Sequence, residues 1–292
     1  MTRRTLFASG LASALAAPAL SAAPRLPIKK AVLLSMLPTE LSFRDRFQLA
    51  ADCGFEQVEA YTVSDLAIAE EIRKASELAK VPIHSVMNSD HWKFPLSSGD
   101  PEVVAKCRAG METSIRNAKL WGAQTVLLVP AVVDAKTSYA DAWKRSQTEI
   151  RKLIPLAQES KVIIAVEEVW NKFLTSPLEF ATYIDEFKSP WVKAYFDIGN
   201  CMRYGWPEHW ARTLGKRIIK LDIKEFSVKK MNEEGLYKGF VDLWDGDVNW
   251  KGVMAEIRSL GYTDGWGTAE ITGGGPDRMK EIVEKMDRIY AA

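Results

Sequence analysis

Histidine and cysteine are scarce in this 292-residue chain, which contains only three of each. Cys53, Cys107 and Cys201 are odd in number and far apart, so they form no disulfide framework. The chain has no Cys-x-x-Cys or His-x-x-x-His spacing of the kind that typical zinc sites use. The scarcity of both residues argues against thiolate sites and against sites built from several imidazoles.

A dominant charge and an internal linker are also lacking. The formal net charge is +1, from 39 basic and 38 acidic residues, so no general attraction to nucleic acid is indicated and no nucleic-acid partner is expected. Hydrophobic residues make up 47% and charged residues 26% of the chain, as in an ordinary soluble domain with a sizeable core. Because no Pro/Gly/Ser-rich linker divides them, residues 24–292 are predicted to form a single domain.

The first 23 residues are different in character. Arg3 and Arg4 precede an apolar, Ala-rich run from Leu6 to Ala23, a pattern typical of a twin-arginine export signal. The alternative is an uncleaved membrane helix or a lipid anchor, but the run is short and no cysteine follows it. We therefore expect residues 1–23 to be removed, the protein to be periplasmic, and no stable membrane insertion to remain after cleavage.

Apolar runs and amphipathic stretches alternate through the rest of the chain. The runs predicted as strands are 31–36, 57–61, 82–87, 125–129, 162–166, 192–196, 218–221 and 266–269. The predicted helices are 43–53, 64–80, 101–121, 141–158, a helix from Pro177, 207–214, 250–260 and 276–290. Eight such units predict an α/β fold, a closed (β/α)8 TIM barrel, with residues 224–249 as a long loop over its mouth. An open doubly wound sheet is the alternative, but no Gly-x-Gly-x-x-Gly follows the first strand.

Four carboxylates stand at the downstream ends of four of these strands: Glu168, Asp197, Asp222 and Glu270. A single acid in this position often caps the next turn or helix. Four at the carboxyl ends of barrel strands converge on the face where barrels carry their active sites. Glu167 directly precedes Glu168 and is expected on the opposite side of its strand, among the helices.

The ligand set predicted in this way consists only of oxygen atoms. Such sites suit hard divalent ions, so Mn²⁺ or Mg²⁺ is expected, with Co²⁺ or Zn²⁺ as further possibilities.

Short motifs around these acids resemble a known family. The motifs are EVWNKF (168–173), DIGN (197–200), DIKE (222–225), GDVNW (246–250) and Glu270. The chain resembles the xylose isomerase-like TIM barrel superfamily, and within it the sugar-phosphate isomerase/epimerase group that includes D-tagatose 3-epimerase and related keto-glycoside lyases. The resemblance implies that Glu168, Asp197 and Glu270 hold a metal ion and that the two glutamates act as acid and base. The chain departs from the family at Asp222, where the pattern has a metal-binding histidine, and at Asn200, where the epimerase pattern has a histidine near the substrate.

The chemistry implied is enolisation of a carbohydrate. A metal-bound carbonyl stabilises the charge that develops when a carboxylate removes the proton on the neighbouring carbon. Returning the proton to the opposite face gives epimerisation, returning it to the adjacent carbon gives isomerisation, and losing a β-substituent gives elimination. Because sugar phosphates are mainly cytosolic, export favours a free sugar or keto-sugar, with a 3-keto-glycoside lyase as the alternative.

Several other residues are candidates for substrate binding. His91 and Trp92 follow the third strand and are candidates to contact sugar hydroxyls and a sugar face, or they form an exposed pair with no role. Three further candidates lie at or near strand ends: Glu59, Asn200 and Lys224. For Glu59 and Lys224, the alternative to substrate binding is a local ion pair.

Two other function classes remain open at this point. A hydrolase of the apurinic endonuclease branch needs several histidines around three zinc ions, which three scattered histidines do not provide. A non-catalytic periplasmic sugar-binding barrel is compatible with the change at Asp222. Barrels of this type often pair, so a homo-oligomer is possible, although the sequence defines no interface.

Overall fold

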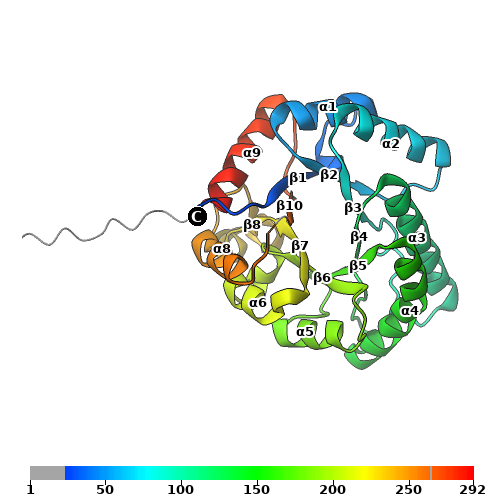
Figure 1. Ribbon diagram of the computed structural model, residues 1–292. Coiled ribbons are helices and arrows are strands. Elements are labelled where there is room, and N and C mark those ends of the chain that lie inside the picture. Colours follow the sequence, from blue (N-terminus) through cyan, green and yellow to red (C-terminus); the bar gives the residue numbers. More distant parts are fainter. Residues whose placement is uncertain (1–23, 264) are drawn as a thin grey trace, which may run out of the picture.

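The computed structural model describes residues 24–263 and 265–292, and within them eight parallel strands close into a barrel (Figure 1). The strand order around the barrel is β1-β10-β7-β6-β5-β4-β3-β2, and β1 pairs with both β10 and β2. The barrel strands are β1 Lys29–Leu33, β2 Gln57–Tyr61, β3 Ile83–Met87, β4 Thr125–Leu128, β5 Ile163–Glu167, β6 Val192–Asp197, β7 Ile218–Ile223 and β10 Trp266–Ala269. The (β/α)8 prediction is confirmed. Residues 1–23, the predicted export signal, lie outside the described residues.

Helices form the outer ring around these strands (Figure 1). The α-helices of this ring are α1 Phe43–Cys53, α2 Leu66–Ala79, α3 Pro101–Trp121, α4 Tyr139–Ser160, α5 Pro177–Asp185, α6 Pro207–Leu214, α8 Trp250–Ser259 and α9 Pro276–Tyr290. Short 3-10 turns lie at η1 Leu34–Met36, η2 Asn200–Arg203 and η3 Gly215–Arg217. Proline opens four of the α-helices, as the sequence predicts, because its fixed φ suits the first turn.

Helix boundaries follow from local capping. Gly54 ends α1 in the left-handed region at φ 93°, where glycine is favoured. The predicted starts of two helices were wrong by two residues: Asp65 caps α2, which starts at Leu66, and Ser138 caps α4, which starts at Tyr139. Both caps accept hydrogen bonds from backbone N–H groups of the first turn, so the hydrogen-bonding side chain sets the start.

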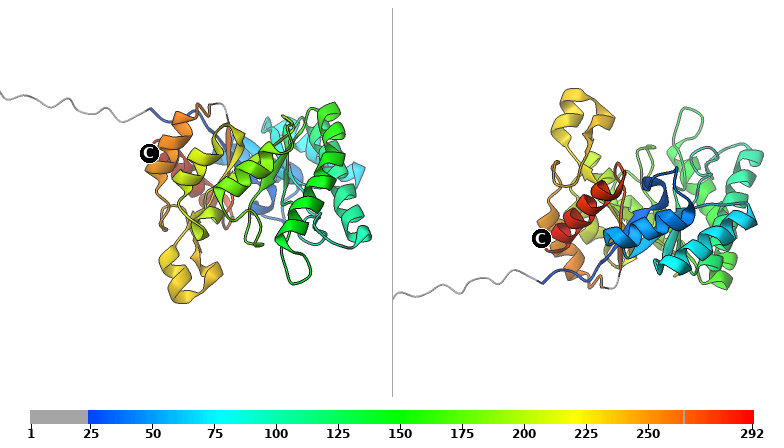
Figure 2. Two further views of the ribbon diagram at one scale, coloured as in Figure 1. Left: turned by 90° about the horizontal axis from the view of Figure 1, so that it is seen from below. Right: turned by 90° about the horizontal axis from the view of Figure 1, so that it is seen from above.

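Residues 224–249 are not the unstructured loop that the sequence predicts. They contain β8 Glu225–Phe226, α7 Val228–Glu234, η4 Leu236–Gly239 and β9 Phe240–Val241, with β8 and β9 paired antiparallel. We call residues 225–241 the excursion. Figure 2 shows it projecting beyond the barrel at the end opposite to the one where the chain enters at Pro24.

The buried carboxylate of Glu225 fixes the base of the excursion. Its Oε1 accepts hydrogen bonds from the backbone N–H groups of Phe226 and Val248, at 3.1 and 3.0 Å. Its Oε2 accepts from the Trp244 backbone N–H at 3.1 Å and from the Trp250 indole at 2.7 Å. Four donors on one carboxylate tie the start of the excursion to the chain that leads into α8.

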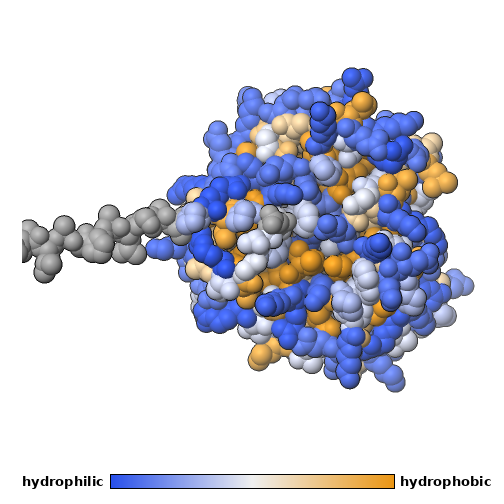
Figure 3. Space-filling view, viewed as in Figure 1, coloured by the Kyte–Doolittle hydropathy of each residue, from blue (hydrophilic) through white to orange (hydrophobic). Residues whose placement is uncertain are grey.

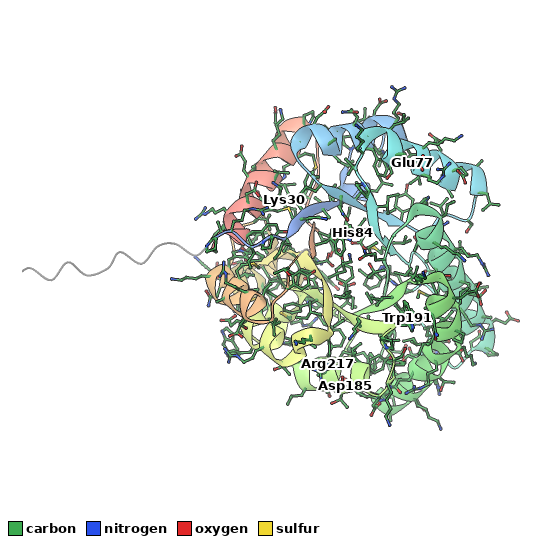
Figure 4. All side chains as sticks on the ribbon, in the orientation of Figure 1. Lys30, Glu77, His84, Asp185, Trp191 and Arg217 are labelled. Carbon is green, nitrogen blue, oxygen red and sulfur yellow. The ribbon has the colours of Figure 1, made fainter. Side chains whose placement is uncertain are left out.

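The barrel interior carries a layer of polar side chains. Tyr195 donates to Glu59 Oε2 at 2.5 Å, and Thr268 donates to the same oxygen at 3.1 Å. The Thr268 hydroxyl also lies 3.2 Å from Nε2 of His84, which Figure 4 places inside the ring of strands. Lys220 is fully buried, with its ammonium 3.1 Å from the centre of the Trp266 ring. The layer joins β2, β3, β6, β7 and β10 by polar contacts.

The outside of the barrel is polar. Figure 3 shows mainly hydrophilic residues over the helices, with hydrophobic ones gathered between them. Ion pairs tie helices to neighbouring elements, as where Arg217 donates to Asp185 at 2.7 Å on the rim labelled in Figure 4. None of the described helices has the length and apolar character that crossing a membrane would require.

The loop after β10 packs tightly against the end of η1, which generates a prediction about Gly273. Its neighbour Gly274 donates a backbone hydrogen bond to the Met36 carbonyl, and a Cβ on Gly273 would lie 2.0 Å from that same oxygen. We expect Gly273→Ala to lower the free energy of unfolding by about 1–3 kcal/mol, because the two loops must separate. Gly275→Ala is the control, since a Cβ there meets nothing within 4 Å. Thermal unfolding followed by circular dichroism checks the pair, and equal melting temperatures would contradict the account.

Candidate metal centre

Four carboxylates from four strands meet at the mouth of the barrel. Glu167, Asp197, Asp222 and Glu270 each offer one oxygen, and these oxygens all lie within 4.8 Å of one another. They come from the ends of β5, β6 and β7 and from the residue after β10, which are consecutive strands of the barrel. We call these four residues the carboxylate cluster. The predicted convergence of Asp197, Asp222 and Glu270 is therefore observed, while metal binding itself stays a prediction.

The fourth member differs from the prediction. Glu167 lies in the cluster in place of Glu168, because β5 ends at Glu167 and side chains alternate between the two faces of a strand. Glu167 shares the interior face with Ala165, which packs in a small apolar group with Tyr195 of the barrel interior. The expectation that Glu167 packs among the helices, with Glu168 facing the site, was wrong.

Glu168 is instead buried outside the cluster. Its side chain is 1% exposed, and among the described residues neither of its carboxylate oxygens has a hydrogen-bond partner. Burial raises the pKa of Glu168 well above its usual value, and the nearby charges of Asp197 and Glu167 raise it further. The surroundings of this carboxyl group therefore favour its protonated form.

Burial and mutual repulsion also govern the cluster itself. Asp197 and Asp222 lie directly opposite each other in the register of β6 and β7, an arrangement that repels when both are ionised. Burial raises the pKa of Glu167 and of Asp222 well above the usual range, and the charge of Glu270 adds to both shifts. Both Asp222 oxygens lack a hydrogen-bond partner in the described part of the chain. Such oxygens fit a bound cation, which would keep the acids ionised.

Lys224 supplies positive charge to the cluster. Its Nζ lies 2.6 Å from Asp197 Oδ2 and 2.7 Å from Glu270 Oε2, and it donates to Asn200 Oδ1 at 3.3 Å. Burial on its own lowers the pKa of Lys224, but the charges of Asp197 and Glu270 outweigh this and hold the pKa well above its usual value. Lys224 is thus a cation that contacts the cluster in the metal-free protein.

Asn200 orients two of the acids. Its backbone N–H donates to Asp197 Oδ1 at 2.8 Å, and its side-chain amide donates to Glu167 Oε1 at 3.1 Å. The predicted position of Asn200 and Lys224 beside the site is therefore observed, and both contact the cluster directly.

Two cavities open onto the cluster and share Lys224, Phe240 and Glu270. One, of about 290 Å³, is bounded by aromatic side chains and by Glu167 and Asn200. Its aromatic and apolar wall consists of Met87, Trp92, Val169, Trp170, Tyr237 and Phe240. The other, of about 490 Å³, lies beside the excursion and contains Asp242 and Arg278. Volumes of this order suit small-molecule ligands.

The remaining predicted substrate contacts divide into two groups. Trp92 is 59% exposed and lines the aromatic cavity. His91 is 1% exposed, and its Nδ1 accepts a hydrogen bond from the Val129 backbone at 3.2 Å, so it holds the chain after β4 and lines neither cavity. Burial lowers the pKa of His91 to about 3, which keeps the ring neutral. Glu59 likewise lies in the interior polar layer and lines neither cavity.

Tyr237 and Phe240, which belong to the excursion, were not among the predicted site residues. The Phe240 ring stacks on Trp170 with centroids 4.6 Å apart, and Tyr237 lies 5.7 Å from the same indole. Trp170 follows β5, so the aromatic wall joins two distant parts of the chain. The available signal was the run Leu236-Tyr237-Lys238-Gly239-Phe240, which places two aromatic residues in an otherwise charged segment.

Comparison with known proteins gives one family and a group of relatives. The sequence pattern of the xylose isomerase-like TIM barrel family matches residues 47–292. The putative L-ribulose-5-phosphate 3-epimerase SgbU of Escherichia coli K12 is 26% identical over 237 residues, which cover 77% of this chain and 82% of that protein.

Solved structures show the same architecture. A D-allulose 3-epimerase from Methylomonas sp. superposes with a TM-score of 0.73 at 16% identity, covering 92% of this chain and 100% of that one. The 3-keto-D-glucoside 4-epimerase YcjR of E. coli superposes with a TM-score of 0.75 at 11% identity, covering 91% and 100%. At these identities the likeness shows a shared fold.

The two adjacent glutamates give a matched test of the cluster. We expect Glu167→Gln to weaken Mn²⁺ binding by at least about tenfold, because it removes one of four convergent carboxylates, and Glu168→Gln to change it little. Isothermal titration of the metal-free protein with MnCl₂ measures both. The opposite ranking would show that Glu168, and not Glu167, is the ligand.

The interior layer predicts a pH dependence of stability. Burial raises the pKa of Glu59 from its ordinary 4.5 to about 7, although the hydrogen bonds from Tyr195 and Thr268 partly oppose the shift. Between these values the folded protein holds a proton that the unfolded chain has released, so the Glu59 contribution to stability falls as the pH rises from about 4.5 to about 7. We expect Glu59→Gln to remove this fall. Urea unfolding of both proteins in EDTA at pH 5 and pH 8 tests it, and parallel changes in the two proteins would contradict it.

Proposed function

We propose, from the premise that the chain belongs to the xylose isomerase-like TIM barrel family, that it is a metal-dependent sugar epimerase or isomerase acting on a free sugar or keto-sugar. The observation that carries the proposal is the carboxylate cluster at the barrel mouth, beside a cavity with an aromatic wall. The epimerase names of its relatives agree with the reaction type, although the sequence relative is named for a sugar phosphate.

The chain's residues fit a divalent cation. The cluster offers only oxygen ligands, and the unpartnered oxygens of Asp222 point to a missing positive charge. Glu167, Asp197, Asp222 and Glu270 would hold the ion, with Mn²⁺ or Mg²⁺ as the expected metal. When bound, such an ion supplies the Lewis acidity that stabilises negative charge on a substrate oxygen.

Proton transfer falls to two carboxylates of the cluster. Glu167 and Glu270 both line the aromatic cavity, and the strands that carry them are separated by β6 and β7. One of the two, as the carboxylate, would remove the proton next to the substrate carbonyl, and the other, starting as the carboxylic acid, would return a proton from a different direction and end ionised. The role that the family resemblance gave to Glu168 passes to Glu167, because Glu167 faces the cavity. Acid-base assistance of this kind contributes roughly 10² to 10⁴ in rate.

The cavity walls favour a sugar without a phosphate group. Aromatic faces such as those of Trp170 and Trp92 suit the apolar face of a sugar ring. The cationic residues lining the two cavities are Lys224 and Arg278, and both are already paired, Arg278 with Asp242 at 2.6 Å. In the metal-free protein, both of these cations in the described walls are therefore already paired and neither is free to bind a phosphate.

The N-terminal pattern agrees with this substrate class. We propose that residues 1–23 direct the protein to the periplasm as a twin-arginine signal and that residues 24–292 act there as one domain. A free or oxidised sugar is a substrate that an exported enzyme would meet.

Exchange of substrate protons with heavy water tests the proposal. We expect the Mn²⁺-loaded protein to incorporate deuterium next to the carbonyl of D-tagatose or D-allulose, because enolisation releases that proton, and NMR identifies the carbon and the product. Glu270→Gln is expected to lower the rate by about 10² or more.

Two controls make the result specific. Glu168→Gln changes a buried carboxylate outside the cluster and is expected to keep the exchange within a few-fold of the unchanged protein. L-Ribulose and L-ribulose 5-phosphate, compared at equal concentration, test the preference for a free sugar. Failure of the metal-loaded protein to exchange protons in any of these substrates would refute the epimerase and isomerase assignment and leave the sugar-binding alternative.

A further inference from the structure

Lys224 occupies half of the cluster that a metal ion would use. Its ammonium is within 2.7 Å of carboxylate oxygens of Asp197 and Glu270, two of the four acids, and its side chain is only 11% exposed. The other two acids, Glu167 and Asp222, have no ion pair with it. The lysine therefore forms ion pairs on one side of the cluster and none on the other side.

An ammonium group and a divalent ion cannot both be close to these oxygens without strong repulsion. One oxygen from each of the four acids lies within 4.8 Å of the other three, so an ion bound among them is close to an ammonium that contacts the carboxylates of Asp197 and Glu270. Charges this close interact strongly in a buried site, where water screens them little. The lysine side chain is the partner that can move, because it is a point charge on a flexible stem.

We propose that Lys224 is a tethered counter-ion that holds the carboxylate cluster together in the metal-free protein and is displaced from Asp197 and Glu270 when a divalent ion binds. The inference rests on the metal site of the proposed function. In this arrangement the free energy of breaking two buried ion pairs opposes metal binding. The cluster therefore binds the metal ion less tightly than the same four carboxylates would bind it without a competing lysine.

The surroundings give the displaced ammonium a destination. Lys224 lines both cavities, and its Nζ already lies 5.4 Å from the centre of the Phe240 ring, within the range of a cation–π contact. A small shift away from the cluster moves the charge toward the aromatic wall. Metal binding then moves the lysine ammonium to the side where substrate oxygens enter. The site is therefore prepared for the sugar once the metal ion is bound.

Gly199 fixes the path of the lysine stem. A Cβ on this residue would lie 2.7 Å from Lys224 Cγ and 2.8 Å from its Cβ, so the glycine leaves room for the stem to reach the acids. The backbone of Gly199 has φ −77°, which alanine adopts without strain. The same Cβ would lie 3.0 Å from the Lys224 carbonyl oxygen, so Gly199→Ala displaces residue 224, its backbone included, while the lysine charge remains in the protein.

Calorimetric titration of the EDTA-treated protein with MnCl₂ tests the inference. We expect Lys224→Met to raise the Mn²⁺ affinity at least about tenfold and to lower the melting temperature of the metal-free protein, because the competing cation and its ion pairs are lost together. Lys229→Met makes the same chemical change at an exposed position in the excursion and is expected to change neither value. Unchanged or weaker Mn²⁺ binding by Lys224→Met would overturn the inference.

Gly199→Ala is a second variant, included because Lys224→Met could change Mn²⁺ binding by disturbing the fold. It is expected to raise the Mn²⁺ affinity as well, by less than Lys224→Met, and to add nothing further in the double variant. An additive effect, or an affinity below that of the unchanged protein, would count against the tethered counter-ion.

The calorimetry also separates this inference from the proposed function. If the unchanged protein and Lys224→Met bind Mn²⁺ equally and deuterium exchange proceeds, only the inference fails. If neither protein binds Mn²⁺, the metal site fails and the inference fails with it. If Lys224→Met binds more tightly but no substrate exchanges its protons, the counter-ion stands and the epimerase assignment falls.

Discussion

The structure depends on keeping four carboxylates close together, three of them buried and Glu270 partly exposed. The four come from consecutive strands, and their oxygens lie within 4.8 Å of one another. Like charges at this distance oppose folding unless protons or cations compensate them. Lys224, the hydrogen bonds of Asn200 and the closed ring of strand pairs together hold the cluster against this repulsion. The stability of the barrel mouth and its capacity for chemistry therefore have the same origin.

Much of the fold was predictable because its signals are local. Prolines at helix starts and Gly54 at the end of α1 act through their own backbone preferences, so no distant contact is needed to read them. The convergence of Asp197, Asp222 and Glu270 was predictable for a different reason. Parallel strands present their carboxyl ends at one face of a barrel, and this follows from topology alone.

Topology alone does not predict which of the adjacent residues Glu167 and Glu168 faces the barrel interior. A displacement by one residue turns a side chain to the other face of its strand. The run Val162–Val166 is apolar on both faces, because a barrel strand is buried by the interior on one side and by helices on the other. It therefore lacks the polar alternation that would mark the inward side. Glu225 and Lys220 were missed for a related reason, since a buried charge is explained only by partners that the fold brings to it.

The excursion makes the substrate wall separable from the barrel. Glu225 anchors it at its base through four hydrogen bonds, and the aromatic residues it contributes lie beyond that anchor. Insertions or deletions between residues 227 and 239 would change the shape of the wall without entering a barrel strand. In this chain the shape of the cavity wall is thus free to change at the excursion while the carboxylate cluster stays as it is.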